Sequence, residues 1–84
     1  MIYEKRLRRE RTELVEYRTI SIHQDIGYDI SSEDKLVQGS LLTDRAVGFR
    51  SAQWRATEQG AFGLADTMLK SSIDDGFVLV DVGS

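Results

Sequence analysis

Residues 18–30 read Arg-Thr-Ile-Ser-Ile-His-Gln-Asp-Ile-Gly-Tyr-Asp-Ile, and this stretch decides the fold. From Ile20 onward the even positions are apolar, apart from Gln24, whereas the odd positions are polar or glycine. A period of two places alternate side chains on opposite sides of a β-strand. One side therefore faces a core and the other faces solvent, which is typical of an antiparallel sheet that is covered on one face.

The same stretch forms either a hairpin or one long strand. Asp25-Ile26-Gly27 suits a three-residue loop, in which a type I turn is closed by a glycine in the left-handed region. That loop sets Gln24 opposite Tyr28 and Ile22 opposite Ile30, so that both isoleucines stay on one face. We favour the hairpin for this reason. In the alternative of a single strand, Gly27 forms a bulge.

The segment before this stretch is less regular. Residues 3–16 fit a helix, because Tyr3, Leu7 and Leu14 lie at helical spacing, but they also fit a strand that leads into Ile20. We expect an extended chain from about Glu13 onward and leave the first dozen residues open.

The segment after it contains turn-forming residues. Ser31-Ser32-Glu33-Asp34 predicts a cap or turn, followed either by a short helical turn to Gly39 or by a strand over residues 35–42. Thr43-Asp44 predicts another turn. Residues 45–56 then fit a strand whose alternation breaks near residues 51–53.

One convincing helix lies between Thr57 and Gly76. Thr57 suits the N-cap, and Gly76 suits the left-handed position after the C-terminus. We expect Gly60 and Gly63 to allow close approach of the first half of the helix to the sheet. Apolar residues between the caps form a stripe at three- and four-residue spacing, which includes Ala61, Phe62, Ala65, Met68 and Leu69.

Residues 77–82 are apolar on both parities, except for Asp81, as in a strand that lies inside a sheet.

These elements predict an α+β fold in one domain over residues 1–84, with a charged, Arg-rich N-terminal segment (residues 1–12). The expected architecture is an antiparallel sheet of about four or five strands with one main helix, over about residues 58–75, packed on one face. The C-terminal strand (residues 77–82) lies inside the sheet. We expect the helix to pack through Phe62, Ala65 and Leu69 on a sheet face that carries Ile20, Ile22 and Ile30.

Composition narrows the functional class. The 84 residues carry a net charge of −3. They contain no cysteine, so neither a disulfide framework nor a thiolate metal site is possible. No apolar run is long enough for a membrane span, and no secretory signal is visible, so we expect a cytoplasmic protein without a membrane partner.

An enzyme is not expected. His23 is the single histidine and falls on the polar side of the strand. We therefore interpret it as a surface residue rather than as a general base or a pH-sensitive contact. Carboxylates such as Asp25 and Asp29 do not have the spacing of a calcium loop, and Gly60-Ala61-Phe62-Gly63 does not match a phosphate-binding loop. The sequence therefore predicts no catalytic residue, no cofactor and no metal site.

Two groups of residues are candidates for binding. Trp54, Arg50 and Arg55 are the residue types that dominate protein interfaces, and on a strand Arg50 shares a side with Trp54 while Arg55 points the other way. Trp54 fits the core and an interface about equally. The second group lies in the Arg-rich segment, where a nucleic-acid contact would use Lys5, Arg6, Arg8, Arg9 and Arg11.

The leading hypothesis is a small non-enzymatic binding protein that recognises another protein by surface complementarity. Inhibitors, immunity proteins, antitoxin-like proteins and phage-encoded antagonists have this size and acidity, an analogy that rests on no motif. One alternative is a nucleic-acid-associated accessory protein that uses the Arg-rich segment. The other is a homo-oligomeric structural subunit, such as a homodimer, because the core is thin and sheet edges are exposed.

Overall fold

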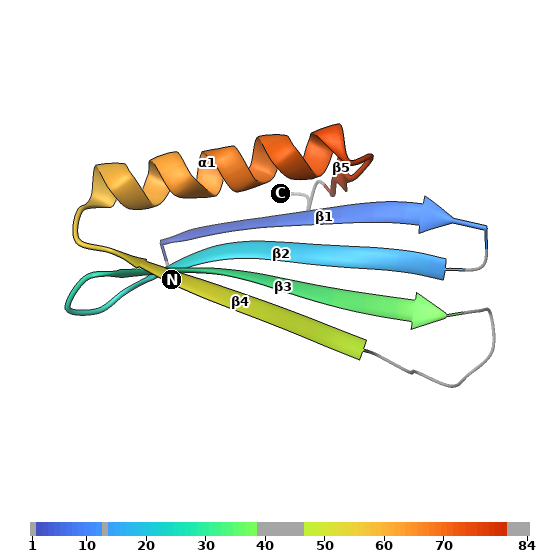
Figure 1. Ribbon diagram of the computed structural model, residues 1–84, viewed down its shortest axis with the longest axis horizontal. Helices are drawn as coiled ribbons and strands as arrows, with labels where there is room; N and C mark the ends of the chain where they lie inside the picture. The colour runs from blue at the N-terminus through green and yellow to red at the C-terminus, as the bar shows by residue number, and fades with distance from the viewer. Residues whose placement is uncertain (1, 13, 39–46, 81–84) are drawn as a thin grey trace.

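A five-stranded antiparallel sheet with one helix on its face forms the molecule (Figure 1). The computed structural model describes residues 2–12, 14–38 and 47–80. The elements are β1 (Tyr3–Arg11), β2 (Leu14–Gln24), β3 (Tyr28–Gln38), β4 (Val47–Arg55), α1 (Glu58–Asp74) and β5 (Val78–Leu79). The strand order is β4-β3-β2-β1-β5. The predicted α+β class is confirmed, with a single main helix within one residue of the expected range.

The core lies between α1 and one side of the sheet. Its strand residues are Leu7, Ile20, Ile22 and Ile30, each at most 1% exposed. Ala61 and Ala65 of α1 are fully buried against them, while Phe62 and Leu69 pack on the core only in part. The predicted sheet residues are therefore confirmed. The expectation for the helix was incomplete, because its closest approach is made by two alanines, whose short side chains let the helix axis come near the strands.

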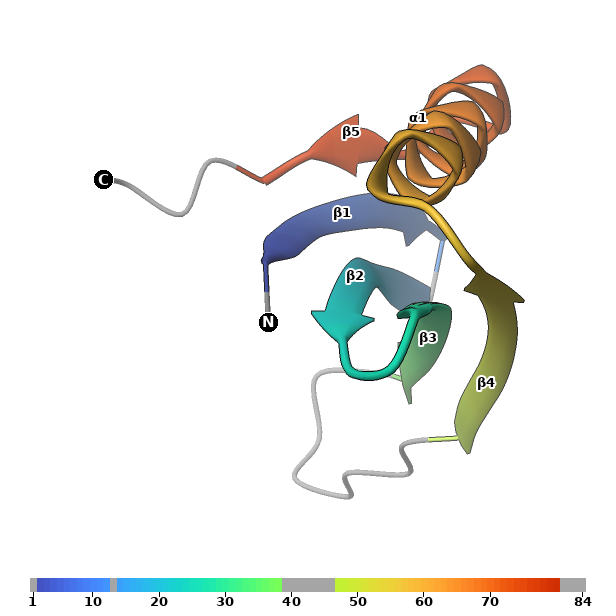
Figure 2. The same cartoon turned by 90° about the vertical axis from the view of Figure 1, so that its left-hand side faces the viewer.

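The curvature of the sheet limits what the helix covers. Seen along the strands in Figure 2, the strands follow a curve with α1 on its inner side. The helix packs on β2 and β3 and less closely on β4. As a result, residues 50–54 of β4 are all exposed.

The hairpin over residues 18–30 is confirmed in its register, with Ile22 opposite Ile30 and Gln24 opposite Tyr28. The expected turn geometry is wrong. Among the described residues only Gly76 has a positive φ, so Gly27 is not in the left-handed region. Glycine is needed at position 27 for another reason, which is that the Trp54 ring lies against it.

The structure decides one open question about the strands and contradicts two expectations. Residues 3–11 are a strand rather than a helix, because β1 pairs along its whole length with β2. The turn expected over residues 31–34 is wrong, since β3 runs unbroken from Tyr28 to Gln38. The alternation of β4 does not break near residues 51–53 either, because nine consecutive pairs join it to β3. The turn expected at Thr43-Asp44 lies outside the described residues.

Both helix ends are capped as the sequence predicts. The Gly60 amide donates to the Thr57 side chain over 3.1 Å. At the other end Gly76 has φ 101°, and the amides of Gly76 and Phe77 donate to the Ile73 and Ser72 carbonyls at 3.0 Å each. These two bonds form a Schellman motif. The role expected for Gly63 is wrong, because a side chain there would point into open space.

The C-terminal strand joins the sheet, as expected, but its position is at the edge and not between other strands. β5 pairs only with β1, where Leu7 faces Leu79. The reason is topological: β2 and β3 already have neighbours on both sides, so free backbone remains only outside β4 and outside β1, and α1 ends beside Arg9 of β1 and Arg18 of β2. Val78 and Leu79 are exposed, and Phe77 is the buried member of this segment. Residues 81 and 82 lie outside the described residues.

Two isoleucines of the β2–β3 hairpin provide a matched test of this core. Ile22 is fully buried, whereas Ile26 at the hairpin tip is 99% exposed. Ile22→Ala is expected to lower the free energy of unfolding by about 2–5 kcal/mol, because it removes buried atoms and leaves a cavity. Ile26→Ala is expected to change it by less than about 0.5 kcal/mol. Urea denaturation followed by circular dichroism measures both, and equal effects would contradict the assignment of the two faces.

Candidate functional site

The side of the sheet that points away from α1 is the candidate site, and we call it the open face. It carries the even positions of β1 and β4 and the odd positions of β2 and β3. Among the described residues, no helix or strand packs on it (Figures 1 and 2). Solvated sheet faces are usually polar, so large aromatic side chains exposed on this face are informative.

Trp54 is the most prominent of these side chains. It lies near the end of β4 and is 55% exposed, so it does not belong to the core. Its indole lies against Gly27 in the β2–β3 loop, and a Cβ atom at Gly27 would overlap with the ring. Trp54 therefore buries Gly27, and only glycine at position 27 lets the indole ring lie so close to the backbone. The contact fixes the ring on the hairpin while leaving more than half of the side chain in solvent.

The other two predicted partner-binding residues lie on opposite sides of the sheet. Arg50 is exposed on the open face, where Ala52 lies between it and Trp54 along the strand. Arg55 is on the helix side, where its guanidinium donates to the Trp54 carbonyl over 2.8 Å. The structure thus brings Arg50 and Trp54 to one surface and separates Arg55 from them.

The open face has one further exposed aromatic residue that the sequence analysis did not select. Tyr17, 39% exposed, lies between Arg8 of β1 and Lys35 of β3 in the strand register. Ile26 lies in the same loop as Gly27 and is 99% exposed, but it belongs to no strand of the open face. The strand register would have identified Tyr17 as a candidate site residue, because only the pairing of β2 with β1 and β3 shows that it has charged neighbours.

Cations and carboxylates on the open face are equal in number among the described residues. The cations are Arg6, Arg8, Lys35 and Arg50, and the carboxylates are Glu4, Glu10, Asp29 and Glu33. Arg6 pairs with Glu4 at 3.1 Å, and Arg8 pairs with Glu10. A face with balanced charges and exposed aromatic groups resembles a protein interface more than a phosphate-binding surface.

The open face also brings together the residue types of a hydrolase triad. Ser21 faces Ser31 across the β2–β3 pair, and His23 faces Asp29 one row further along. The two serine hydroxyls are buried and lie 2.8 Å apart in a hydrogen bond with each other. Among the described residues, no hydrogen bond joins His23 to either serine or to Asp29. The arrangement therefore lacks the nucleophile–base contact of nucleophilic catalysis.

The candidate nucleic-acid residues do not form one surface. Alternation along β1 sends Arg6 and Arg8 to the open face and places Lys5, Arg9 and Arg11 on the helix side. Both Arg9 and Arg11 pair with Glu16, at 2.6 and 2.8 Å. Four of the five cations are thus partnered by carboxylates, which reduces the charge available to a phosphate backbone.

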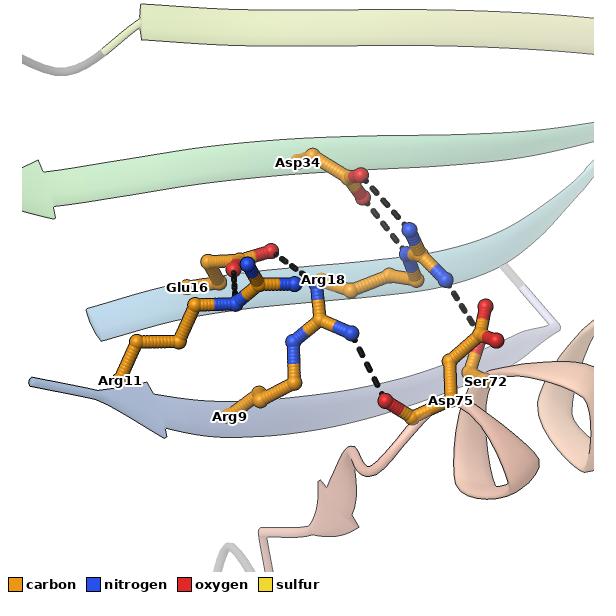
Figure 3. A network of polar contacts seen from close by, with 7 residues as sticks. All are labelled: Arg9, Arg11, Glu16, Arg18, Asp34, Ser72 and Asp75. Atoms are coloured by element: carbon orange, nitrogen blue, oxygen red, sulfur yellow. Dashed lines mark hydrogen bonds and ion pairs between the residues drawn. The ribbon is translucent and has the colours of Figure 1, made fainter. Parts of the chain in front are cut away.

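Arg9 and Arg18 instead join the sheet to the end of α1 (Figure 3). Arg18 binds both carboxylate oxygens of Asp34, at 2.8 and 2.9 Å, and donates to the Ser72 hydroxyl at 2.8 Å. Arg9 donates to the Asp75 carbonyl over 2.7 Å. The two guanidinium carbons each lie 4.4 Å from the centre of the Phe77 ring. The hydrogen bond with Asp34 raises the pKa of the Arg18 guanidinium above its ordinary value.

This network explains an unusual feature of the helix. Asp74 and Asp75 lie at the negative end of the helix dipole, and the last turn of α1 contains no basic residue. Arg9 and Arg18 supply the missing positive charge from the sheet. We interpret the network as structural, because the Arg18 guanidinium and both terminal nitrogens of Arg9 have partners within the chain, and only the buried Nε of Arg9 has none.

A hollow of about 340 Å³ lies between α1 and β4 on the helix side. It is lined by Ser32, Ser51 and Gln53 of the sheet, by Thr67, Met68, Ser71 and Ser72 of the helix, and by Arg18. The Arg18 guanidinium is already occupied by Asp34 and Ser72. The hollow therefore has hydroxyl groups but no free charge from Arg18 to fix a ligand.

Residues 2–12, 14–38 and 47–80 contain no cluster of histidine and acidic residues that fits a metal ion. None of the described helices is long and apolar enough to cross a membrane. The sequence matches no protein-family model, and comparison with curated proteins and with solved structures gives no match.

The contact between Gly27 and Trp54 generates the first prediction for this site. Gly27→Ala is expected to lower the free energy of unfolding by about 1–3 kcal/mol, because the added methyl group displaces the indole. In a Trp54→Ala background the same change is expected to be neutral or stabilising by up to about 1 kcal/mol, since alanine restricts the unfolded chain. A double-mutant cycle in urea measures the coupling, and additive effects would show that the ring does not rest on Gly27.

The second prediction concerns Arg18. Arg18→Ala is expected to lower the free energy of unfolding by about 1.5–3 kcal/mol, because it leaves the carboxylate of Asp34 without its charged donors. Arg6→Ala removes an exposed ion pair with Glu4 and is the matched control, with an expected loss of at most about 1 kcal/mol. Chemical denaturation measures both variants, and a larger effect at Arg6 would refute the structural role of Arg18.

Proposed function

We propose that this chain is a non-enzymatic protein-binding module that recognises another protein through its open face. The observation that carries the proposal is the 55% exposure of Trp54, whose indole is fixed against Gly27. A rigid, half-exposed indole loses little conformational entropy on binding and offers a large apolar area. Tryptophan, tyrosine and arginine dominate the binding energy of protein interfaces, and Trp54, Tyr17 and Arg50 supply one of each on this face.

The balanced charge of the open face supports a protein partner over nucleic acid. Nucleic-acid surfaces need unpaired cations, whereas Arg6 and Arg8 of this face have carboxylate partners. Mixed charges around a few aromatic anchors are suited to selecting one protein, since mismatched charges penalise wrong partners. Inhibitors, immunity proteins, antitoxins and phage antagonists act in this way, and we place this chain among such binding proteins of the cytoplasm by its size, acidity and lack of cysteine.

Paired variants test the proposal. The chain, immobilised through its C-terminus, is used to capture proteins from a cell extract, in parallel with Trp54→Ala and with Ile73→Ala. Ile73 is 48% exposed on α1 and is the control for loss of an exposed apolar group. A specific partner is expected to be retained by the wild-type chain and by Ile73→Ala, and to bind Trp54→Ala at least tenfold more weakly, which corresponds to about 1.4 kcal/mol.

Stability measurements complete the test. Trp54→Ala is expected to lower the free energy of unfolding by less than about 2 kcal/mol, because the side chain is more than half exposed. A loss of 3–5 kcal/mol, roughly that of a core tryptophan, with unaltered affinity in the remaining folded protein would overturn the role of Trp54. Capture of nucleic acid at about 50 mM salt, abolished by Arg6→Ser and Arg8→Ser, would support the alternative function instead.

A further inference from the structure

Within the part of the chain that the structure describes, the edge strand β4 lacks most of the usual protection against pairing with another strand. Among the described residues, β4 pairs only with β3, so every second amide and carbonyl along its outer side is without a strand partner. Edges are normally blunted by proline, lysine, a bulge or an inward charge. Residues 47–55 contain no proline and no lysine, and their unbroken register with β3 shows no bulge. Their charges are two arginines, Arg50 on the open face and Arg55 on the helix side.

The sequence of β4 is complementary to itself in the antiparallel direction. Residues 49–55 read Phe-Arg-Ser-Ala-Gln-Trp-Arg, with Ala52 at the centre. Counting outward from Ala52, Ser51 is matched by Gln53, Arg50 by Trp54 and Phe49 by Arg55. Each cation is thus matched with an aromatic residue, and each short polar residue with another polar residue.

We propose that a second copy of this chain binds along β4, antiparallel, with its two-fold axis at Ala52. The two sheets then form one continuous sheet of ten strands. Arg50 of each copy lies directly opposite Trp54 of the other on the open face, within reach of a cation–π contact. The same register sets Arg55 opposite Phe49 of the second copy.

Electrostatics selects this register over the one with its axis at Ser51. Residues 47–55 contain two arginines and no carboxylate, so a second copy cannot supply an ion pair from β4. With the axis at Ala52, the two Arg50 positions are separated by four residues, or about 13 Å along the strands. With the axis at Ser51, they become diagonal neighbours about 7–8 Å apart, and Trp54 faces Gly48 instead of a cation.

The position of α1 makes this edge accessible. The helix packs mainly on β2 and β3, and Ser51 and Gln53 on the helix side of β4 are exposed. Backbone pairing therefore requires no displacement of a described element. Because a strand edge is a small interface, the association is expected to be weak and concentration-dependent.

A cross-linking experiment tests the register, since the chain has no natural cysteine. With the axis at Ala52, the two Ala52 residues face each other with Cα atoms about 4.5–5.5 Å apart, which is within the range of a disulfide. Ala52→Cys is expected to form a covalent dimer under mild oxidation. Lys70→Cys, exposed on α1, is the control for random collision. Equal cross-linking of both variants, or none of Ala52→Cys, would overturn the register.

Sedimentation equilibrium of the full chain, up to about 1 mM, tests the energetics without a cysteine. The wild-type chain is expected to move from monomer toward dimer as its concentration rises. Trp54→Ala and Arg50→Glu are each expected to raise the dimer dissociation constant at least tenfold, whereas Arg50→Lys and Trp54→Phe are expected to retain most of the association. Circular dichroism confirms that every variant is folded.

The outcomes separate this inference from the proposed function. A monomer at every concentration, or a dimer unaffected by Trp54→Ala and Arg50→Glu, overturns the inference, whether or not a partner protein is captured. A concentration-dependent dimer with these mutational effects supports it, even when no partner protein is found.

Discussion

The two guanidinium groups that enclose Phe77 are the interaction on which the rest of the structure depends. A helix with two alanines at its closest approach buries little apolar area, and its described charges are mostly acidic: Glu58, Asp66, Asp74 and Asp75 against Lys70. The helix side of the sheet is correspondingly basic. Arg9 and Arg18 meet the acidic helix end, cover Phe77 and bind Glu16 and Asp34 behind them. Charge therefore adds to a thin apolar core in holding the helix on the sheet.

This attachment also determines what stays uncovered. The network fixes the end of α1 over β1 and β2, and the rest of the helix lies along the inner side of the curved sheet. Because of the curve, the helix packs less closely on β4 than on β2 and β3, so residues 50–54 of that strand are exposed on both sides as well as at its edge. The described residues form a single helix, so none of them is left to cover the open face. Both candidate interaction surfaces follow from a single-helix fold.

Local patterns in the sequence predict those parts of the fold that depend on local physics. Alternation over residues 18–30 specifies the hairpin register, and Thr57 and Gly76 specify the helix ends, because each signal acts within a few residues. The edge position of β5, the unbroken β3 and the structural role of Arg9 depend on pairing between distant segments, which no local pattern contains. Serines and acidic residues at positions 31–34 suggest a turn by propensity, yet Ser31 bonds Ser21 and Asp34 bonds Arg18 across the sheet. For the candidate site, the sequence identifies Arg50 and Trp54, whereas Tyr17 and the contact of Trp54 with Gly27 emerge only from the register.

The two proposed interactions use the same side chain and therefore constrain each other. One part of the Trp54 indole lies against Gly27, so only the exposed remainder can meet another molecule. In an edge-paired dimer, that remainder faces Arg50 of the second copy. A partner protein that docks on Trp54 competes with this contact, and dimerisation reduces the fraction of chains that can bind. Because the dimer is weak, a partner protein separates the two copies at little cost in free energy. While no partner is present, the dimer covers the exposed strand edge and the exposed indole. An open strand edge and an exposed aromatic anchor thus belong together in this fold, because each copy can cover both on the other.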